Sequence, residues 1–210
     1  MRILFVVTNL DLGGAEAQVV TLASGLAGRG HQVELVSLID PVARTEQLDA
    51  AAVPWHSLGM KRGLPDPRGL LKLRSIIRRF RPDVVHAHMV HANLLARLTR
   101  LLTRMPRLIT TAHNTIEGGR LLDLGYRLTD RLADLTTNVS DASVESFIKR
   151  GLSRPGRITA VVNGLDLQPF IEAGAGRQSA QAISVGGFAL IWLPLAAWLF
   201  AKDGEATRGR

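Results

Sequence analysis

Short apolar runs alternate with longer amphipathic segments along most of the chain. The apolar runs, which are rich in β-branched residues, predict seven strands at 3–7, 33–38, 53–58, 84–87, 108–112, 135–139 and 158–162. The segments with apolar positions three or four residues apart predict helices at 15–28, 68–80, 92–102, 121–133 and 141–149. This alternation is typical of an α/β fold, a parallel sheet of about seven strands with helices on both faces. Such sheets bind ligands beyond the carboxyl ends of their strands, so residues just after strands are the candidates for function.

The composition indicates one folded domain followed by a tail. The chain has 210 residues, of which 46% are hydrophobic, and no cysteine. The absence of cysteine excludes a disulfide scaffold, a thiolate nucleophile and a cysteine-based zinc site. The apolar run 3–7 is too short for a signal peptide and polar residues follow it, so we expect a cytoplasmic protein.

The net charge of +8 is concentrated in one stretch. Residues 61–110 hold twelve Lys and Arg but two Asp and Glu. Four of these cations lie on the predicted helix 68–80, namely Lys72, Arg74, Arg78 and Arg79. A solvated helix face is the usual outcome. The functional alternative is docking on anionic lipid headgroups, which would make the protein peripheral at the inner face of the membrane. Nucleic acid is disfavoured as a partner because Phe80 is the one aromatic residue of the stretch.

Paired glycines end the loop that follows the first predicted strand. Gly13 and Gly14 would let the backbone approach a ligand closely, and the next helix offers free N–H groups to a phosphate. A tight turn that needs glycine explains the pair equally well. The loop lacks both the G-x-G-x-x-G spacing and the Walker A sequence, which disfavours NAD binding and ATP hydrolysis. Asn163 and Gly164 follow the last strand and by themselves indicate a turn.

Histidines follow two of the predicted core strands. His113, with Asn114 after it, lies at a strand exit, where an imidazole could bond a sugar hydroxyl or act as an acid or base. A satisfied strand-end histidine is the structural alternative. His86, His88 and His91 form a second group, and because His86 and His88 alternate along a strand we expect one of them to face inward. A lining of a polar cleft is favoured over a metal site, since no cysteine or well-spaced carboxylate completes a ligand set.

These features, in this order, resemble the family 4 retaining glycosyltransferases of GT-B fold. The segments that carry the resemblance are LGGAE at 12–16, RPDVVHAH at 81–88, TAHN at 111–114 and VVNGLD at 161–166. The resemblance spans about residues 1–172 and implies that this part is the Rossmann-like N-terminal half of a GT-B fold. In that fold, two such domains face each other across a cleft, and the N-terminal one chiefly binds the acceptor.

The resemblance also implies roles for individual residues. His113 would contact the transferred sugar as the catalytic residue. The residues that would bind the diphosphate or substrate are Gly13, Gly14, Asn114, Asn163 and Gly164. The implied partners are a nucleotide-sugar donor and a glycan or lipid-linked acceptor. Transfer in this family retains the anomeric configuration and usually needs no metal, so no cofactor is expected.

The last forty residues depart from the family pattern. Relatives continue with a second domain that holds the nucleotide-sugar, whereas residues 173–210 form an atypical tail with an uncharged apolar segment at 186–201. We favour out-of-frame translation of an interrupted gene over a membrane anchor or a cover for a sheet edge. The chain is therefore expected to be a glycosyltransferase fragment that is inactive alone. The alternative function is a non-catalytic membrane-surface or ligand-binding α/β module.

Overall fold

A computed structural model describes residues 1–62 and 66–164 of the chain. Met1–Ala160 form one compact unit, and the described residues that follow, 161–164, belong to a second. The predicted tail at 173–210, with its apolar segment 186–201, lies outside the described residues. Among the helices that are described, none has the length and apolar character needed to cross a membrane.

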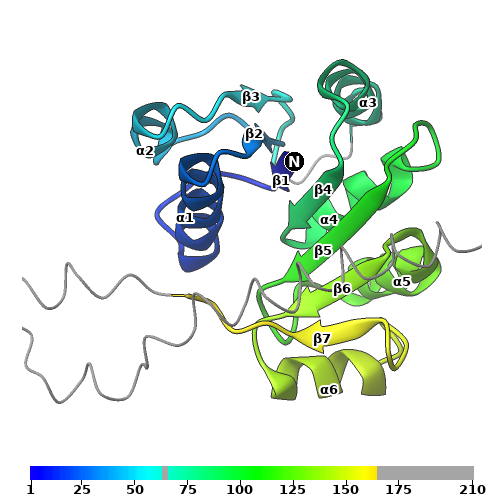
Figure 1. Cartoon of the computed structure of the whole chain (residues 1–210). Coiled ribbons are helices and arrows are strands. Elements are labelled where there is room, and N and C mark those ends of the chain that lie inside the picture. Colours follow the sequence, from blue (N-terminus) through cyan, green and yellow to red (C-terminus); the bar gives the residue numbers. More distant parts are fainter. Residues whose placement is uncertain (63–65, 165–210) are drawn as a thin grey trace, which may run out of the picture. The chain divides into compact units, whose positions relative to one another are not determined.

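Seven parallel strands form one sheet, which confirms the predicted α/β fold (Figure 1). The strands are β1 (Arg2–Val7), β2 (Gln32–Ser37), β3 (Trp55–Ser57), β4 (Val84–His88), β5 (Arg107–Ala112), β6 (Leu135–Asn138) and β7 (Ile158–Ala160). Their order in the sheet is β3-β2-β1-β4-β5-β6-β7. This is the doubly wound order of Rossmann-like folds, in which the chain first adds strands on one side of β1 and then, from β4 onward, on the other side.

Six α-helices and one 3₁₀ turn connect the strands in the described part of the chain. They are α1 (Gly14–Gly28), α2 (Thr45–Ala50), α3 (Arg68–Phe80), α4 (Val90–Thr99), α5 (Arg120–Thr129), η1 (Asp130–Leu132) and α6 (Asp141–Lys149). Helix α2 was not predicted, because its six residues bury one side chain, Leu48, and so show no periodicity. Helix α4 begins two residues before the predicted start and ends at Thr99 rather than at 102.

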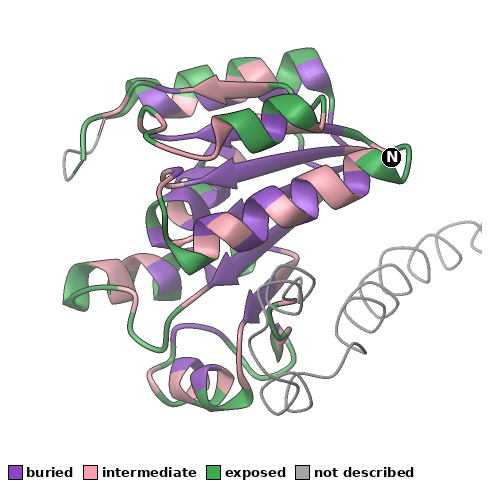
Figure 2. Cartoon of the chain, turned by 90° about the vertical axis from the view of Figure 1, so that its left-hand side faces the viewer, coloured by how far each residue is buried: buried purple, intermediate pink, exposed green. Residues whose placement is uncertain are grey.

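Helices cover both faces of the sheet, as predicted. Figure 1 shows α1 and α2 on one side and α3, α4 and α5 on the other. One core cluster lies on the α3 and α4 side, where Leu4 and Val6 of β1 pack with Leu73 and Ile77 of α3. Tyr126 of α5 and Phe147 of α6 contact each other edge to face in a second core cluster. Figure 2 shows that the central strands are buried along their length.

The alternation of side chains sends a polar row to the other face of the sheet. Phe5 of β1 lies next to the rings of His86 and His88, with ring centroids 5.5 and 5.7 Å apart. Both histidines are buried. The expectation that one of the two faces inward and the other does not is therefore wrong, because residues two apart on a strand point to the same face.

Candidate functional site

The candidate site lies where the strand order reverses, at the carboxyl ends of β1, β4 and β5. Val7 at the end of β1 pairs with His88 at the end of β4. His88 in turn pairs with Thr111, next to the end of β5. The three following loops therefore leave the sheet at one edge, within roughly 10 Å from β1 to β5. This is where open α/β sheets bind their ligands.

The glycine loop brings the N-terminus of α1 to this edge. The helix begins at Gly14, and its first intrahelical bond runs from Ala17 N to Gly13 O, 3.1 Å. The N–H groups of the first three helical residues precede that bond and have no partner within the helix. Gly13 has φ −70° and ψ 165°, an extended conformation that any residue adopts. A left-handed turn is therefore not the reason for this glycine.

A side chain at Gly13 would displace the carboxylate of Glu16. A Cβ built on Gly13 would lie 2.3 Å from Glu16 Oε2, whereas a Cβ on Gly14 would meet nothing within 4 Å. The Glu16 carboxylate is buried and accepts a hydrogen bond from Asn9 Nδ2 at 2.9 Å. Glu16 thus closes the loop between β1 and α1. Glu16 is part of the LGGAE segment that carries the family resemblance, but no separate role was predicted for it.

His113 lies against a second histidine. Its Nε2 is 3.0 Å from His88 Nδ1, so the N–H of one ring donates a hydrogen bond to the nitrogen of the other. Among the described residues, the remaining nitrogens of this pair, His113 Nδ1 and His88 Nε2, are buried without a hydrogen-bond partner. The ring centroid of His86 lies 4.0 Å from that of His88 with the planes tilted by 40°, and His86 Nε2 is hydrogen-bonded to Thr111 Oγ1 at 2.8 Å. The structure therefore joins three of the predicted site residues in one row.

Burial keeps this row uncharged. It lowers the pKa of His113 to about 4 and, with a smaller contribution from the charge of His113, that of His86 to about 3. The pKa of His88 falls well below its ordinary value, first because of burial and then because His86 and His113 are neighbours. At neutral pH the three rings are therefore uncharged hydrogen-bonding groups.

Glu117 fixes the backbone of the His113 loop and was missed from the sequence. Its Oε1 accepts from His113 N at 2.7 Å, and its Oε2 accepts from the Tyr126 hydroxyl at 2.5 Å. An acidic residue in a polar loop carries no signal of its own. Tyr126 is the single tyrosine of the chain, yet nothing in the sequence links the two.

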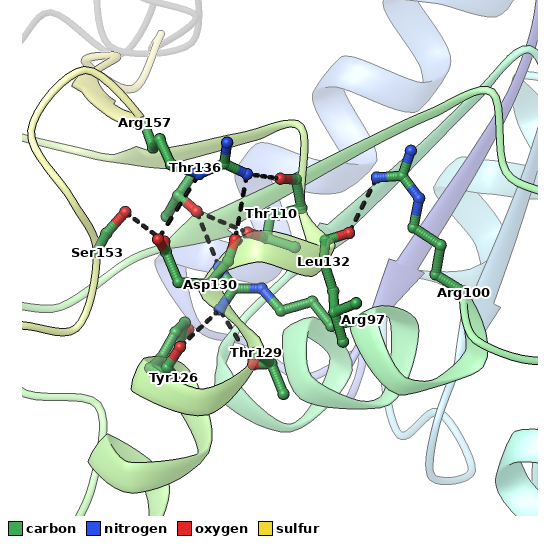
Figure 3. Close-up of polar contacts among 11 residues, drawn as sticks. Arg97, Arg100, Thr110, Tyr126, Thr129, Asp130, Leu132, Thr136, Ser153 and Arg157 are labelled. Carbon is green, nitrogen blue, oxygen red and sulfur yellow. Dashed lines mark hydrogen bonds and ion pairs between the residues drawn. The ribbon is translucent and has the colours of Figure 1, made fainter.

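Arg97 is a buried cation on the α4 side of the sheet (Figure 3). It is 0% exposed, and its Nη2 donates to the hydroxyls of Thr110 and Thr136 at 2.8 Å each. The guanidinium carbon lies 4.9 Å from the centroid of the Tyr126 ring. Burial lowers the pKa of Arg97, although Tyr126 and Asp130 oppose that shift. Arg97 thus holds α5 and the strands β5 and β6 together and does not line the candidate site.

The remaining predicted binding residues are less closely grouped. Asn114 is exposed, and its carbonyl accepts from Asn138 Nδ2 at 3.3 Å, so it lies at the same edge as His113. Asn163 and Gly164 follow β7 and belong to the second unit. The structure therefore does not join them to the site.

Four cationic side chains were predicted to face a membrane surface, and three of them instead bind hydrogen-bond acceptors or a carboxylate within the protein. Lys72 Nζ donates to Leu58 O at 2.6 Å, Arg74 Nε to Leu102 O at 3.1 Å, and Arg79 pairs with Glu34 at 3.4 Å. Arg78 is exposed and has no described partner. Leu71 on the same helix is 60% exposed, so an apolar side chain accompanies these charges.

No group of three or more His, Asp or Glu side chains within 1–62 and 66–164 is arranged to hold a metal ion. His91, the third histidine of the second group, is exposed on α4.

The fold agrees with comparisons to known proteins. The sequence model of Glycosyltransferase Family 4 matches residues 12–169. The chain belongs to glycosyltransferase family 4. That match includes both the glycine loop and the His113 strand exit of the family 4 domain. No curated protein matches the chain in sequence.

Solved structures share the fold of this family 4 domain at low sequence identity. HepE of Anabaena, in complex with UDP, is 20% identical with a TM-score of 0.65 over 86% of this chain and 50% of its own. A glycosyltransferase from Rickettsia africae is 16% identical with a TM-score of 0.65 over 86% and 48%. Sucrose-phosphate synthase from Thermosynechococcus elongatus is 16% identical with a TM-score of 0.60 over 83% and 51%. The chain thus spans about half the length of the solved structures it matches.

Proposed function

We propose that this domain is the acceptor-side half of a transferase that moves a sugar from a nucleotide-sugar to a glycan or lipid-linked acceptor. One observation carries the proposal. The glycine loop with the N-terminus of α1 and the His88–His113 pair lie at the ends of neighbouring strands, at the reversal point of the sheet. That HepE was solved with UDP, and also with UDP and glucose, supports a nucleotide-sugar as the donor.

The two parts of this edge suit different parts of the donor. Free N–H groups and the positive end of the α1 dipole favour an anion, so we assign Gly13 and Gly14 to the diphosphate. The neutral ring of His113, which is less buried than those of His86 and His88, would bond a hydroxyl of the sugar. Asn114, exposed beside His113, would bind substrate from the same loop, and Asn163 with Gly164 would line the entry to the interdomain linker.

The domain is proposed to extend to residue 172 and to be inactive by itself. Donor binding and stabilisation of the leaving diphosphate need a second lobe, and the electrostatic contribution of that lobe is usually the largest part of catalysis. Retention of the anomeric configuration and independence from metal follow the family pattern.

The test is transfer from radiolabelled UDP-glucose, and in parallel from other nucleotide-sugars. The chain is assayed alone and with a separately expressed C-terminal half of a family 4 glycosyltransferase. We expect transfer with both halves, its loss in His113→Ala, and none from the chain alone. Turnover by the chain alone would overturn the claim of inactivity, and full turnover by His113→Ala would overturn the assigned role of the histidine.

A membrane surface is the second candidate function, favoured by the exposed Leu71 and Arg78 on α3. An apolar side chain beside arginines is the pattern by which helices lie on anionic lipid headgroups. This docking would place the protein at the inner face of the membrane, close to a lipid-linked acceptor. Flotation with anionic vesicles tests it, as described below.

A further inference from the structure

The loop that carries His113 is closed by an acidic side chain four residues further on. His113 is the first residue after β5, and its N–H donates to Glu117 Oε1 at 2.7 Å. The N–H of Asn114 also interacts with the Glu117 carboxylate. A carboxylate therefore holds the backbone at the point where the chain leaves the sheet, and hydrogen bonds to a charged acceptor are roughly twice as strong as neutral ones.

The carboxylate is itself held from the opposite side. Tyr126 of α5 is 1% exposed and donates its hydroxyl proton to Glu117 Oε2 at 2.5 Å. The same hydroxyl accepts from Asn93 Nδ2 at 2.8 Å, and that amide also donates to Thr111 O at 2.9 Å. The two N–H groups of the Asn93 amide thus each have one acceptor, as does the Tyr126 hydroxyl. The amide orientation of Asn93 is fixed as well, since its oxygen would otherwise face the carbonyl of Thr111.

The series starts on strand β5 and ends at His113, the residue that follows this strand. It leaves at Thr111, passes through Asn93 of α4 and Tyr126 of α5, and returns through Glu117 to His113. The carbonyl of Thr111 also accepts from Met89 N at 3.1 Å, and Met89 follows His88 with a left-handed φ of 71°. Both histidines of the pair therefore depend on backbone contacts that meet at Thr111.

We propose that Glu117 is the positioning residue of the site, and that its carboxylate sets the backbone from which the His113 ring reaches His88. This role rests on the proposed function, in which His113 contacts the donor sugar. It does not require Glu117 to contact substrate. Without the carboxylate, the N–H of His113 would lose its acceptor. The ring would then be positioned by its hydrogen bond to His88 alone and no longer also by its backbone.

The test uses NMR on the full chain, because it reads the position of His113 independently of transferase activity. The variants are Glu117→Ala, Glu117→Gln and, as a matched control, Glu145→Ala, which removes an exposed glutamate paired with Lys149 on α6. In Glu117→Ala we expect the His113 amide proton to exchange with solvent at least about tenfold faster, because it loses one hydrogen bond to a charged acceptor. The ¹⁵N shifts of the His113 ring should change with it, because the tautomer is set by the contact with His88.

Glu117→Gln keeps an acceptor for His113 N but loses the acceptor for Tyr126, so its exchange rate should lie between those of wild type and Glu117→Ala. Far-ultraviolet circular dichroism confirms that each variant folds. Unchanged exchange and unchanged ring shifts at His113 in a folded Glu117→Ala protein would overturn the proposal. If the His113 signals change as expected while His113→Ala leaves sugar transfer by the two halves intact, the positioning role stands and the proposed function fails.

Discussion

Acidification should destabilise this domain through its row of three buried histidines. His86, His88 and His113 are neutral in the folded protein, because burial holds the pKa of His113 at about 4 and that of His86 at about 3, with His88 also well below the ordinary value. In the unfolded chain each ring takes up a proton near the ordinary pKa of 6.5. The unfolded state therefore binds more protons as the pH falls.

The size of the effect follows from proton linkage. The stabilising contribution is complete above pH 6.5 and is lost as the pH falls toward the folded-state pKa values. Between pH 7 and pH 5 each histidine costs about 2 kcal/mol of unfolding free energy, or about 6 kcal/mol for the row. Burial raises the pKa of Glu117, so that residue acts in the opposite direction and reduces the total. A loss of this size is comparable to the whole stability of a typical domain.

Urea unfolding followed by circular dichroism at pH 7, 6 and 5 measures this loss directly. The variant His113→Gln should lose about 2 kcal/mol less than wild type between pH 7 and pH 5, since one of the three titrating rings is gone. His91→Gln, at an exposed position on α4, is the control and should follow wild type. An equal acid loss in His113→Gln and wild type would refute the neutral buried row.

Three other changes probe the loop, the core and the surface. Gly13→Ala should lower the unfolding free energy by about 1 kcal/mol, because the new methyl displaces Glu16 from Asn9, while Gly14→Ala should be neutral or stabilising. Equal effects of the two substitutions in thermal melts would contradict this. Tyr126→Phe should lower the unfolding free energy by about 2 kcal/mol and the Tm by roughly 4–8 °C, because Glu117 and Asn93 both lose a hydrogen-bond partner. A Tm within about 1 °C of wild type would contradict this prediction. Arg78→Glu should reduce flotation with anionic vesicles several-fold, whereas Arg131→Glu on η1 should not; equal flotation of both would argue against α3 as the docking surface.

Most of the fold could be predicted because apolar periodicity fixes strands and helices locally. The runs at 3–7 and 108–112 became β1 and β5 almost unchanged. The short helix α2 was not predicted because it buries one side chain and shows no periodicity. The early start of α4 was not predicted because it depends on contacts with other elements. An example is the contact of Ala92 N with Thr8 Oγ1, 3.3 Å, which joins α4 to the loop after β1.

The candidate site was only partly predictable. Strand order places Gly13 and His113 at one edge, and a resemblance in sequence was enough to name both. The pairing of His113 with His88 across two strands, and the closure of its loop by Glu117, depend on register and on the direction of α5. Such contacts join residues with no shared pattern in the sequence, so only the folded chain reveals them.

The central claim is that the glycine loop and His113 meet the same nucleotide-sugar. Titration of the ¹⁵N-labelled chain with UDP-glucose and other nucleotide-sugars, in the presence of the separate C-terminal half, tests it most directly. One donor should shift the amide signals of Gly13 and Gly14 together with those of His113, with the same saturation curve. A donor that binds and shifts only one of these two places, or neither, would contradict the account.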